Sequence, residues 1–270
     1  MQKELSNRLV TRSLLFLEAF DQPLVVYPVG KHLGIRNIMT NKMTFIRQPD
    51  QVKEITGLTL STNRRYLAVN EKRVTDLHAH VTLYDLKQQV TNPKFLKTIN
   101  ISEMVCGQLN RQPGSKDDDA NQKYVASLSF SKDNKYLGIL ISDRNLDTRA
   151  IIYEWISKNK IISTYDFIGQ EINKITFNPK DWQQICTSGP NHWRVWRLQE
   201  SSFKQVQKFQ KIRQDRHYMD HCWLDDDKLI VGTQMGELIY VDNCDEKQYI
   251  ENAYNTGGYG QGPVGEDGKM

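Results

Sequence analysis

One short pattern recurs along the chain and constrains the fold more than any other feature. It consists of an apolar run, a polar turn and a second apolar run, and its clearest copy is Val125–Leu140, VASLSFSKDNKYLGIL. Apolar runs of this length on either side of a turn of Ser, Asp and Asn predict a β-hairpin. Ile55–Val69 is an earlier copy, a third begins at Ile172, and a weaker fourth is HCWLDDDKLIVGT. The chain is therefore predicted to be a repeat protein.

The spacing of the copies predicts a β-propeller. Phe130, Phe177 and Trp223 hold the same place in successive hairpins, at intervals of 47 and 46 residues. A second marker, the aromatic residue at the end of the following strand, advances almost in step. Periods in the forties are typical of blades, small antiparallel sheets that bury both faces against their neighbours. We predict an all-β propeller, a partial or incompletely closed ring of about five blade units.

The predicted organisation along the chain has three parts. Residues 1–20 are an N-terminal segment with two interpretations, a frayed terminus or an outer strand that completes a blade made mostly elsewhere. Residues 21–243 hold the blades, of which the first lacks its opening hairpin. Residues 244–270 are rich in glycine, and we expect a disordered tail. Units two to five are expected at Met43–Leu86, Asn92–Ile156, Lys160–Leu198 and Phe203–Val241.

One insertion separates the second unit from the third. Residues 107–122, within GQLNRQPGSKDDDANQ, are polar and include a run of three acids. Such a segment predicts a surface loop, and the functional alternative is a partner-binding finger. If the ring is incomplete, exposed strand edges should make the isolated chain aggregate or require a partner that lends strands.

Composition narrows the classes of function. The formal net charge is +4, and basic and acidic residues are interspersed without a basic stripe, so we expect no nucleic acid partner. No apolar run reaches the roughly 18 residues of a membrane-spanning helix, so we expect no membrane partner. The four cysteines lack paired spacing, which favours free thiols in a reducing compartment.

The chain contains few residues that suggest catalysis. It lacks a glycine-rich phosphate loop, a GxSxG elbow and an HExxH motif. We therefore predict no enzyme, no catalytic residue and no cofactor. The alternative is a propeller enzyme, in which several His, Asp or Glu side chains would converge at the central channel.

One group of residues invites a metal-site interpretation. His217, His221 and Cys222 stand close together in HYMDHC, at spacings that zinc ligands can have. They lie just before and within a predicted strand, and neither a CxxC motif nor a second ligand cluster accompanies them. We predict that they bind no metal.

Other polar residues have simpler interpretations. Asp225–Asp227 occupy a hairpin turn, where acids favour turn formation. His192 precedes a blade strand, and we expect it to pack and to bond within the turn. His78 and His80 fall in a connector that is expected to be exposed.

Four basic residues are the candidates for partner binding. Arg64, Arg65, Lys72 and Arg73 form the densest basic spot of the sequence. We expect them to project from one rim of the disc. They are either solvated turn residues or a contact to an acidic partner, and isolated surface charges contribute little on their own.

The repeated unit resembles the WD-repeat family. That family has an apolar strand, a Ser-x-Asp/Asn turn and a second strand, followed by a strand ending in an aromatic and an acid. YDL at Tyr84–Leu86 and YEW at Tyr153–Trp155 approximate this ending, whereas Arg197 and Val241 replace the acid later. The resemblance implies a WD-repeat-type β-propeller.

A closer resemblance depends on motifs that occur in a fixed order. From Leu14 to Asp242 the chain is similar to the N-terminal propeller region of the cilia- and flagella-associated protein fifty-seven family. The motifs are VVYPVGKH, SxNRRYLAV, FSKDNKYL, FNPKD and DDKLIVGTQMGELI.

The resemblance implies a function and partners. It implies a non-catalytic scaffold of the ciliary or flagellar axoneme, which helps dock or regulate inner dynein arms and the nexin–dynein regulatory complex on doublet microtubules. The implied partners are components of those assemblies, tubulin, and a related WD-repeat chain that completes the propeller. The alternative is a general cytosolic WD-repeat adaptor.

Overall fold

The computed structural model describes residues 14–19, 22–74, 79–87, 90–101, 123–143, 146–206, 216–225 and 227–250. These residues form five four-stranded antiparallel sheets, each made of four consecutive strands. No helix in these ranges is long and apolar enough to cross a membrane. The prediction of an all-β chain built from repeated sheets is confirmed.

The sheets follow one another along the chain as blades 1 to 5. Blade 1 contains β1 (Leu15–Ala19), β2 (Gln22–Val29), β3 (His32–Asn37) and β4 (Met43–Ile46). Blade 2 contains β5 (Val52–Leu60), β6 (Tyr66–Arg73), β7 (Ala79–Asp85) and β8 (Lys94–Asn100). Blade 3 contains β9 (Tyr124–Phe130), β10 (Tyr136–Ser142), β11 (Thr148–Glu154) and β12 (Lys160–Phe167). Blade 4 contains β13 (Lys174–Phe177), β14 (Gln184–Gly189), β15 (His192–Gln199) and β16 (Ser202–Gln205). Blade 5 contains β17 (Tyr218–Trp223), β18 (Lys228–Thr233), β19 (Leu238–Asp242) and β20 (Asp245–Ile250).

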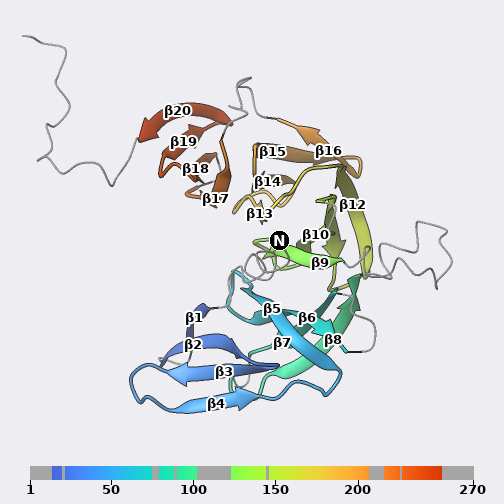
Figure 1. Cartoon of the computed structure of the whole chain (residues 1–270), viewed down its shortest axis with the longest axis vertical. Coiled ribbons are helices and arrows are strands. Elements are labelled where there is room, and N and C mark those ends of the chain that lie inside the picture. Colours follow the sequence, from blue (N-terminus) through green and yellow to red (C-terminus); the bar gives the residue numbers. More distant parts are fainter. Residues whose placement is uncertain are drawn as a thin grey trace, which may run out of the picture.

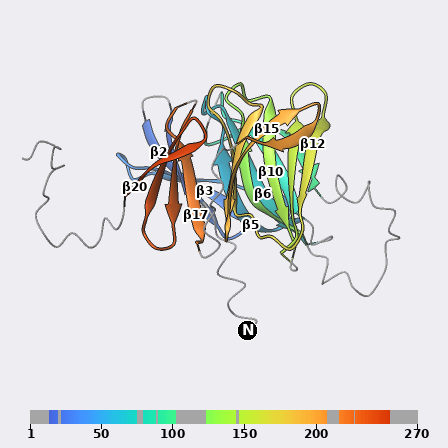
Figure 2. The same ribbon diagram turned by 90° about the horizontal axis from the view of Figure 1, so that it is seen from above.

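The blades stand side by side around an arc that is open between blade 1 and blade 5 (Figure 1). Seen from above in Figure 2, the strands run across the thickness of the disc. The first strand of each blade lies at the inner edge: β1 contacts β5, β5 contacts β9, β9 contacts β13, and β13 contacts β17. The prediction of a propeller whose ring is not closed is thus confirmed for the described residues.

Hydrogen bonds within the hairpin turns account for the Ser-x-Asp/Asn pattern that recurs in the sequence. In blade 3 the Ser131 hydroxyl donates to Asp133 Oδ1 at 2.6 Å and accepts from the backbone N–H of Tyr136 at 3.0 Å. The same bonds recur in blade 2 at Ser61, Asn63 and Tyr66. A side chain that bonds its own turn fixes the hairpin locally, as expected of Ser, Asp and Asn.

Within the described ranges the core consists of four apolar layers, one between each pair of adjacent blades. Strand β6 shows how one run of residues serves two layers. Leu67 and Val69 pack in the layer shared with blade 1, and Ala68 packs in the layer shared with blade 3. Because successive side chains point to opposite faces, a strand buried on both faces is apolar throughout.

Two predicted boundaries need correction. Residues 15–19 form β1, which pairs with β2 and contacts β5, so this strand lies at the inner edge of blade 1 and is not an outer strand. Residues 245–250 form β20, which pairs with β19 and completes blade 5, so the expected disorder from residue 244 is wrong there. Pairing with β19 orders residues 245–250, although this segment has little apolar character of its own. Residues 1–13, the predicted loop 107–122 and residues 251–270 lie outside the described ranges.

Candidate partner-binding surface

The four predicted basic residues do not form one spot. Arg64 and Arg65 lie in the turn before β6, whereas Lys72 and Arg73 lie at the other end of that strand. A strand rises about 3.3 Å per residue, so the two pairs are separated by roughly 23 Å and lie on opposite rims. The expectation of a single rim is therefore wrong, because residues close in sequence are far apart along an extended strand.

Arg65 is engaged in holding its own blade together. Its Nε lies 3.1 Å and its Nη2 lies 2.7 Å from Asp85 Oδ2, at the end of β7. The guanidinium lowers the pKa of the Asp85 carboxyl below its usual value, mainly through these hydrogen bonds. The guanidinium carbon also lies 4.9 Å from the centroid of the Tyr66 ring. These contacts assign Arg65 a role in the turn.

Arg64, by contrast, is exposed at the tip of the turn. Its φ is 58°, in the left-handed region, and Asn134 has a φ of 61° at the same place in blade 3. Asn occupies this region more readily than a residue with a long side chain. Arg64 is thus a residue that the turn does not favour.

Lys72 and Arg73 have acidic neighbours within blade 2. Lys72 Nζ lies 3.9 Å from Glu54 Oε2, and Arg73 Nη2 lies 3.6 Å from Glu71 Oε1. Glu71 is buried and accepts a hydrogen bond from the Thr82 hydroxyl. Burial raises the pKa of the Glu71 carboxyl. This rim therefore carries charges of both signs.

The suspected metal ligands are separated by the fold. His221 is buried between blades 4 and 5, where its Nε2 lies 2.7 Å from Thr176 Oγ1 and its Nδ1 lies 2.8 Å from Ser188 Oγ. His217 forms an isolated bridge with Pro190, and Cys222 is exposed. Among the described residues no group of three or more His, Cys, Asp or Glu could hold a metal. His221 therefore links two blades through hydroxyl groups.

A second buried histidine lies inside blade 4. His192 Nε2 is 2.8 Å from Thr187 Oγ1, and the Trp196 indole N–H donates to the same oxygen at 2.8 Å. The ring of Phe167 meets the His192 ring edge-on, with 5.2 Å between centroids. Burial lowers the pKa of His192 to about 3, so the imidazole is neutral at physiological pH.

The remaining polar residues discussed from the sequence are His78, His80 and the acids of the turn before β18. His80 is buried in β7, so the prediction of an exposed connector is wrong for this residue, because β7 is a middle strand of blade 2 and is covered on both faces. His78 and Asp226 lie outside the described ranges. Asp225 lies in the β17–β18 turn and pairs with Lys180 at 2.9 Å.

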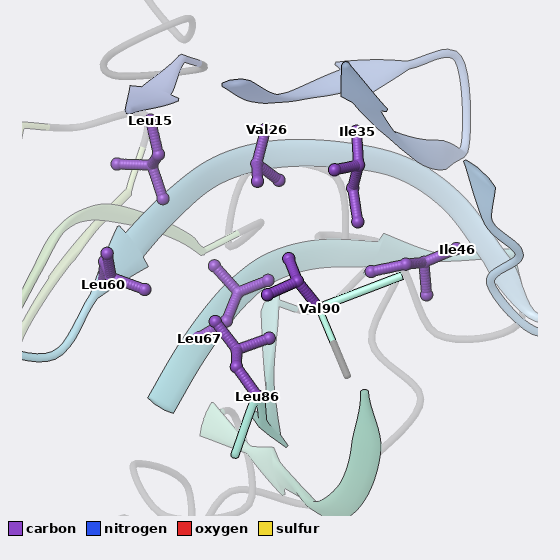
Figure 3. A pocket seen from close by; sticks show the side chains of 8 residues that line it. All are labelled: Leu15, Val26, Ile35, Ile46, Leu60, Leu67, Leu86 and Val90. Atoms are coloured by element: carbon purple, nitrogen blue, oxygen red, sulfur yellow. The ribbon is translucent and has the colours of Figure 1, made fainter. Parts of the chain in front are cut away.

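The hollows of the molecule differ in character. A cavity of about 10 Å³ lies between blades 1 and 2 and is lined only by apolar side chains (Figure 3). A hollow of about 190 Å³ in blade 3 contains the ion pair of Arg149 with Asp166. Another of about 200 Å³ runs along the inner strands and contains the ion pair of Lys174 with Asp220. Each of the larger hollows thus contains one cation paired with one acid.

Comparison with known proteins gives two curated relatives. Cilia- and flagella-associated protein 57 of Mus musculus is 29% identical over 240 residues, which are 88% of this chain and 17% of the relative. Cilia- and flagella-associated protein 57 C of Tetrahymena thermophila is 23% identical over 197 residues, 72% of this chain and 14% of the relative. The chain thus spans less than a fifth of the length of these relatives. No family model matches the sequence.

A solved structure gives the same fold. A chain in the crystal structure of the mitotic checkpoint complex matches 90% of this chain and 66% of its own length, with a TM-score of 0.63 and 14% identity. At this identity the likeness concerns the fold alone. The blade architecture and the solved structure agree that this chain has a propeller fold, and its sequence is similar to that of cilia- and flagella-associated protein 57.

Proposed function

We propose that this chain is a non-catalytic scaffold of the ciliary or flagellar axoneme. The observation that carries the proposal is the likeness to cilia- and flagella-associated protein 57, which extends over 240 of the 270 residues. A propeller suits a scaffold because its rims and loops offer broad surfaces to other proteins.

The finer role follows the family resemblance. In this proposal the chain helps dock or regulate inner dynein arms and the nexin–dynein regulatory complex on doublet microtubules. The disc has two rims, so one rim can face the microtubule while the other faces a dynein or regulatory component. This division accords with the placing of the basic pairs at opposite ends of β6.

Arg64 is the residue to which we assign a contact with an acidic partner such as tubulin. It is exposed on a turn whose geometry favours Asn, so its presence there brings charge at some cost in stability. Arg65 supports Arg64 by fixing the turn to Asp85. Lys72 and Arg73 are assigned to a second contact on the opposite rim.

Imaging and affinity purification test the proposal. A tagged chain expressed in ciliated cells should concentrate in the axoneme and should recover dynein-arm and regulatory-complex components. Arg64→Asn should reduce recovery of the acidic partner, whereas Lys132→Asn, in the corresponding turn of blade 3, should not. A diffuse cytosolic signal with no ciliary enrichment would contradict the axonemal role.

A general cytosolic adaptor is the second candidate function. The fold is compatible with this candidate function, because a chain of the mitotic checkpoint complex has a similar fold. Fold alone does not select a function. Recovery of a stable complex free of dynein and regulatory-complex components would favour this candidate.

A further inference from the structure

A hollow of about 200 Å³ lies along the inner strands of blades 2 to 5. These strands, β5, β9, β13 and β17, face the centre of the arc in Figure 1. Pockets for small molecules usually measure about 300–1,000 Å³, whereas an enclosed water needs only about 10–15 Å³. The hollow is therefore of a size that suits one side chain of another molecule.

Three of these four strands are irregular where they border the hollow. The pairing register shifts at Thr56 in β5, at Ala126 in β9 and at Met219 in β17. All three residues line the hollow. Such a shift, a β-bulge, changes the direction of the strand and of its side chains, and bulges are frequent next to functional sites. The hollow thus coincides with the places where the inner strands depart from regular pairing.

A glycine on β5 opens the hollow toward a polar residue of β6. Gly57 is paired with Asn70, so the two positions are neighbours on one face of blade 2. Ala68, two residues before Asn70, packs in the layer shared with blade 3, so Asn70 points to the same side. Because Gly57 has no side chain, it places none between Asn70 and the inner edge of the blade. Asn70 therefore lines the hollow although it lies on the second strand.

The Asn70 side chain has a hydrogen-bonding atom that the protein does not use. It is 5% exposed, and among the described residues no donor bonds its Oδ1. Buried polar atoms nearly always have a partner. The neighbouring hydroxyl groups do: Thr56 Oγ1 donates to the backbone oxygen of Asn70 at 3.4 Å, and Thr59 Oγ1 donates to that of Leu128 at 3.0 Å. Asn70 thus offers an acceptor to a molecule that enters the hollow.

The charged groups of the hollow balance each other. The Lys174 ammonium group bonds Asp220 Oδ1 and the backbone oxygen of His221. The Lys174 side chain is 10% exposed, whereas that of Asp220 is 61% exposed. A charged ligand would lose hydration in the hollow without meeting an uncompensated opposite charge. A neutral polar group is therefore favoured.

We propose that the hollow binds the side-chain amide of a glutamine from a protein partner. An amide carries one acceptor oxygen and two N–H donors, so the ligand N–H can donate to Asn70 Oδ1 while its C=O accepts from Asn70 Nδ2. A half-turn of the Asn70 amide exchanges these two atoms, and the ligand amide can turn with it. This inference does not depend on the proposed ciliary role.

The depth and the walls of the hollow favour glutamine among the neutral polar side chains. Asn70 lies on the second strand, about 4.8 Å behind the inner one, so the longer side chain of glutamine reaches it better than that of asparagine. Val125 and Leu128 line the hollow and belong to the apolar layer between blades 2 and 3. They offer apolar contact to the methylene groups of glutamine.

Nuclear magnetic resonance of the full chain with isotope-labelled methionine methyl groups tests the proposal. Met219 lines the hollow and is 58% exposed, so its signal reports binding there. Met235, 70% exposed between β18 and β19 of the same blade, gives the control signal. Met219→Leu and Met235→Leu assign the two signals. The probes are capped alanine pentapeptides with glutamine, glutamate, lysine or leucine at the centre, and free glutamine.

The glutamine peptide should shift the Met219 signal and leave the Met235 signal in place. Its affinity should exceed that of every other probe about tenfold, which corresponds to roughly 1.4 kcal/mol. Asn70→Asp replaces the N–H donors with a second acceptor oxygen and adds a negative charge. This variant should therefore transfer the preference from the glutamine peptide to the lysine peptide.

Asn37→Asp is the matched control, because Asn37 is also buried but lies in blade 1. Its Oδ1 accepts from the backbone N–H groups of Met39 and Thr40, as a carboxylate oxygen also can. The control should keep the preference for the glutamine peptide.

Asp220→Asn changes an exposed side chain, so it tests the hollow independently of how well Asn70→Asp folds. It leaves the Lys174 charge without this acid, and the glutamate peptide should gain affinity about tenfold. An unchanged affinity of the glutamate peptide would contradict the charge balance on which the proposal depends. Absence of a Met219 shift, equal shifts of Met219 and Met235, equally tight binding of free glutamine or of the leucine peptide, or a loss of preference in Asn37→Asp would each overturn the proposal.

Discussion

His192 should make the stability of the propeller sensitive to mildly acidic pH. In the folded chain its ring is buried against Phe167 and bonded to Thr187, and its pKa falls from 6.5 to about 3. The unfolded chain binds a proton at about pH 6.5, but the folded chain does not until about pH 3. The unfolded state therefore binds more protons in this window, so the free energy of unfolding falls as pH falls.

The size of the effect follows from the pKa shift. Each pH unit below 6.5 should lower the free energy of unfolding by about 1.4 kcal/mol, so the loss between pH 7 and pH 5 is about 2 kcal/mol. Glu71 acts in the opposite direction, because its raised pKa makes the folded state bind the extra proton. A comparison with a His192 variant removes this second contribution.

Urea denaturation of the unmodified chain and of His192→Gln, at pH 7 and pH 5, measures the effect. Gln can still bond Thr187 but does not titrate, so His192→Gln should lose about 2 kcal/mol less than the unmodified chain over this interval. The absolute stability of the variant is not the test, since any packing loss is the same at both pH values. Equal losses in the two proteins would show that the imidazole is not buried in its neutral form.

Three further changes test the blade architecture through the free energy of unfolding measured by denaturant titration. Thr187→Val should lower the free energy of unfolding by about 2–4 kcal/mol, because the ring nitrogens of His192 and Trp196 lose their hydroxyl partner. The control Thr164→Val, on the outer strand β12, should change this free energy by less than about 0.5 kcal/mol. Equal effects would contradict the bonding in blade 4. Arg64→Asn should stabilise by about 0.5–1 kcal/mol by relieving the left-handed backbone, and a loss of stability would refute that strain. Gly189→Ala should lower the free energy of unfolding by about 2 kcal/mol or more, since the new Cβ would lie 2.4 Å from the backbone oxygen of Glu171. The control Gly232→Ala should be tolerated, because its Cβ would lie 3.8 Å from the nearest atom. An unchanged stability of Gly189→Ala would argue against the close approach at Gly189.

The repeated hairpins could be predicted from the sequence because their causes are local. Ser131 bonds Asp133 and the backbone of Tyr136, and all the partners lie within five residues. Apolar strands such as β10 are buried on both faces, so their pattern also indicated stacked sheets. Local turn chemistry and strand pattern together determined the propeller and its repeat.

The arrangement of side chains between blades was decided only by the tertiary structure. Lys72 and Arg73 are close to Arg64 in sequence, but the extended strand β6 carries them to the opposite rim. His221 finds Thr176 and Ser188 across the junction between two blades, more than thirty residues away in sequence. The place of β1 at the inner edge of blade 1 depends equally on which sheets become neighbours. Turns and strands form from interactions between near residues, whereas these features depend on the packing of sheets that are distant in the chain.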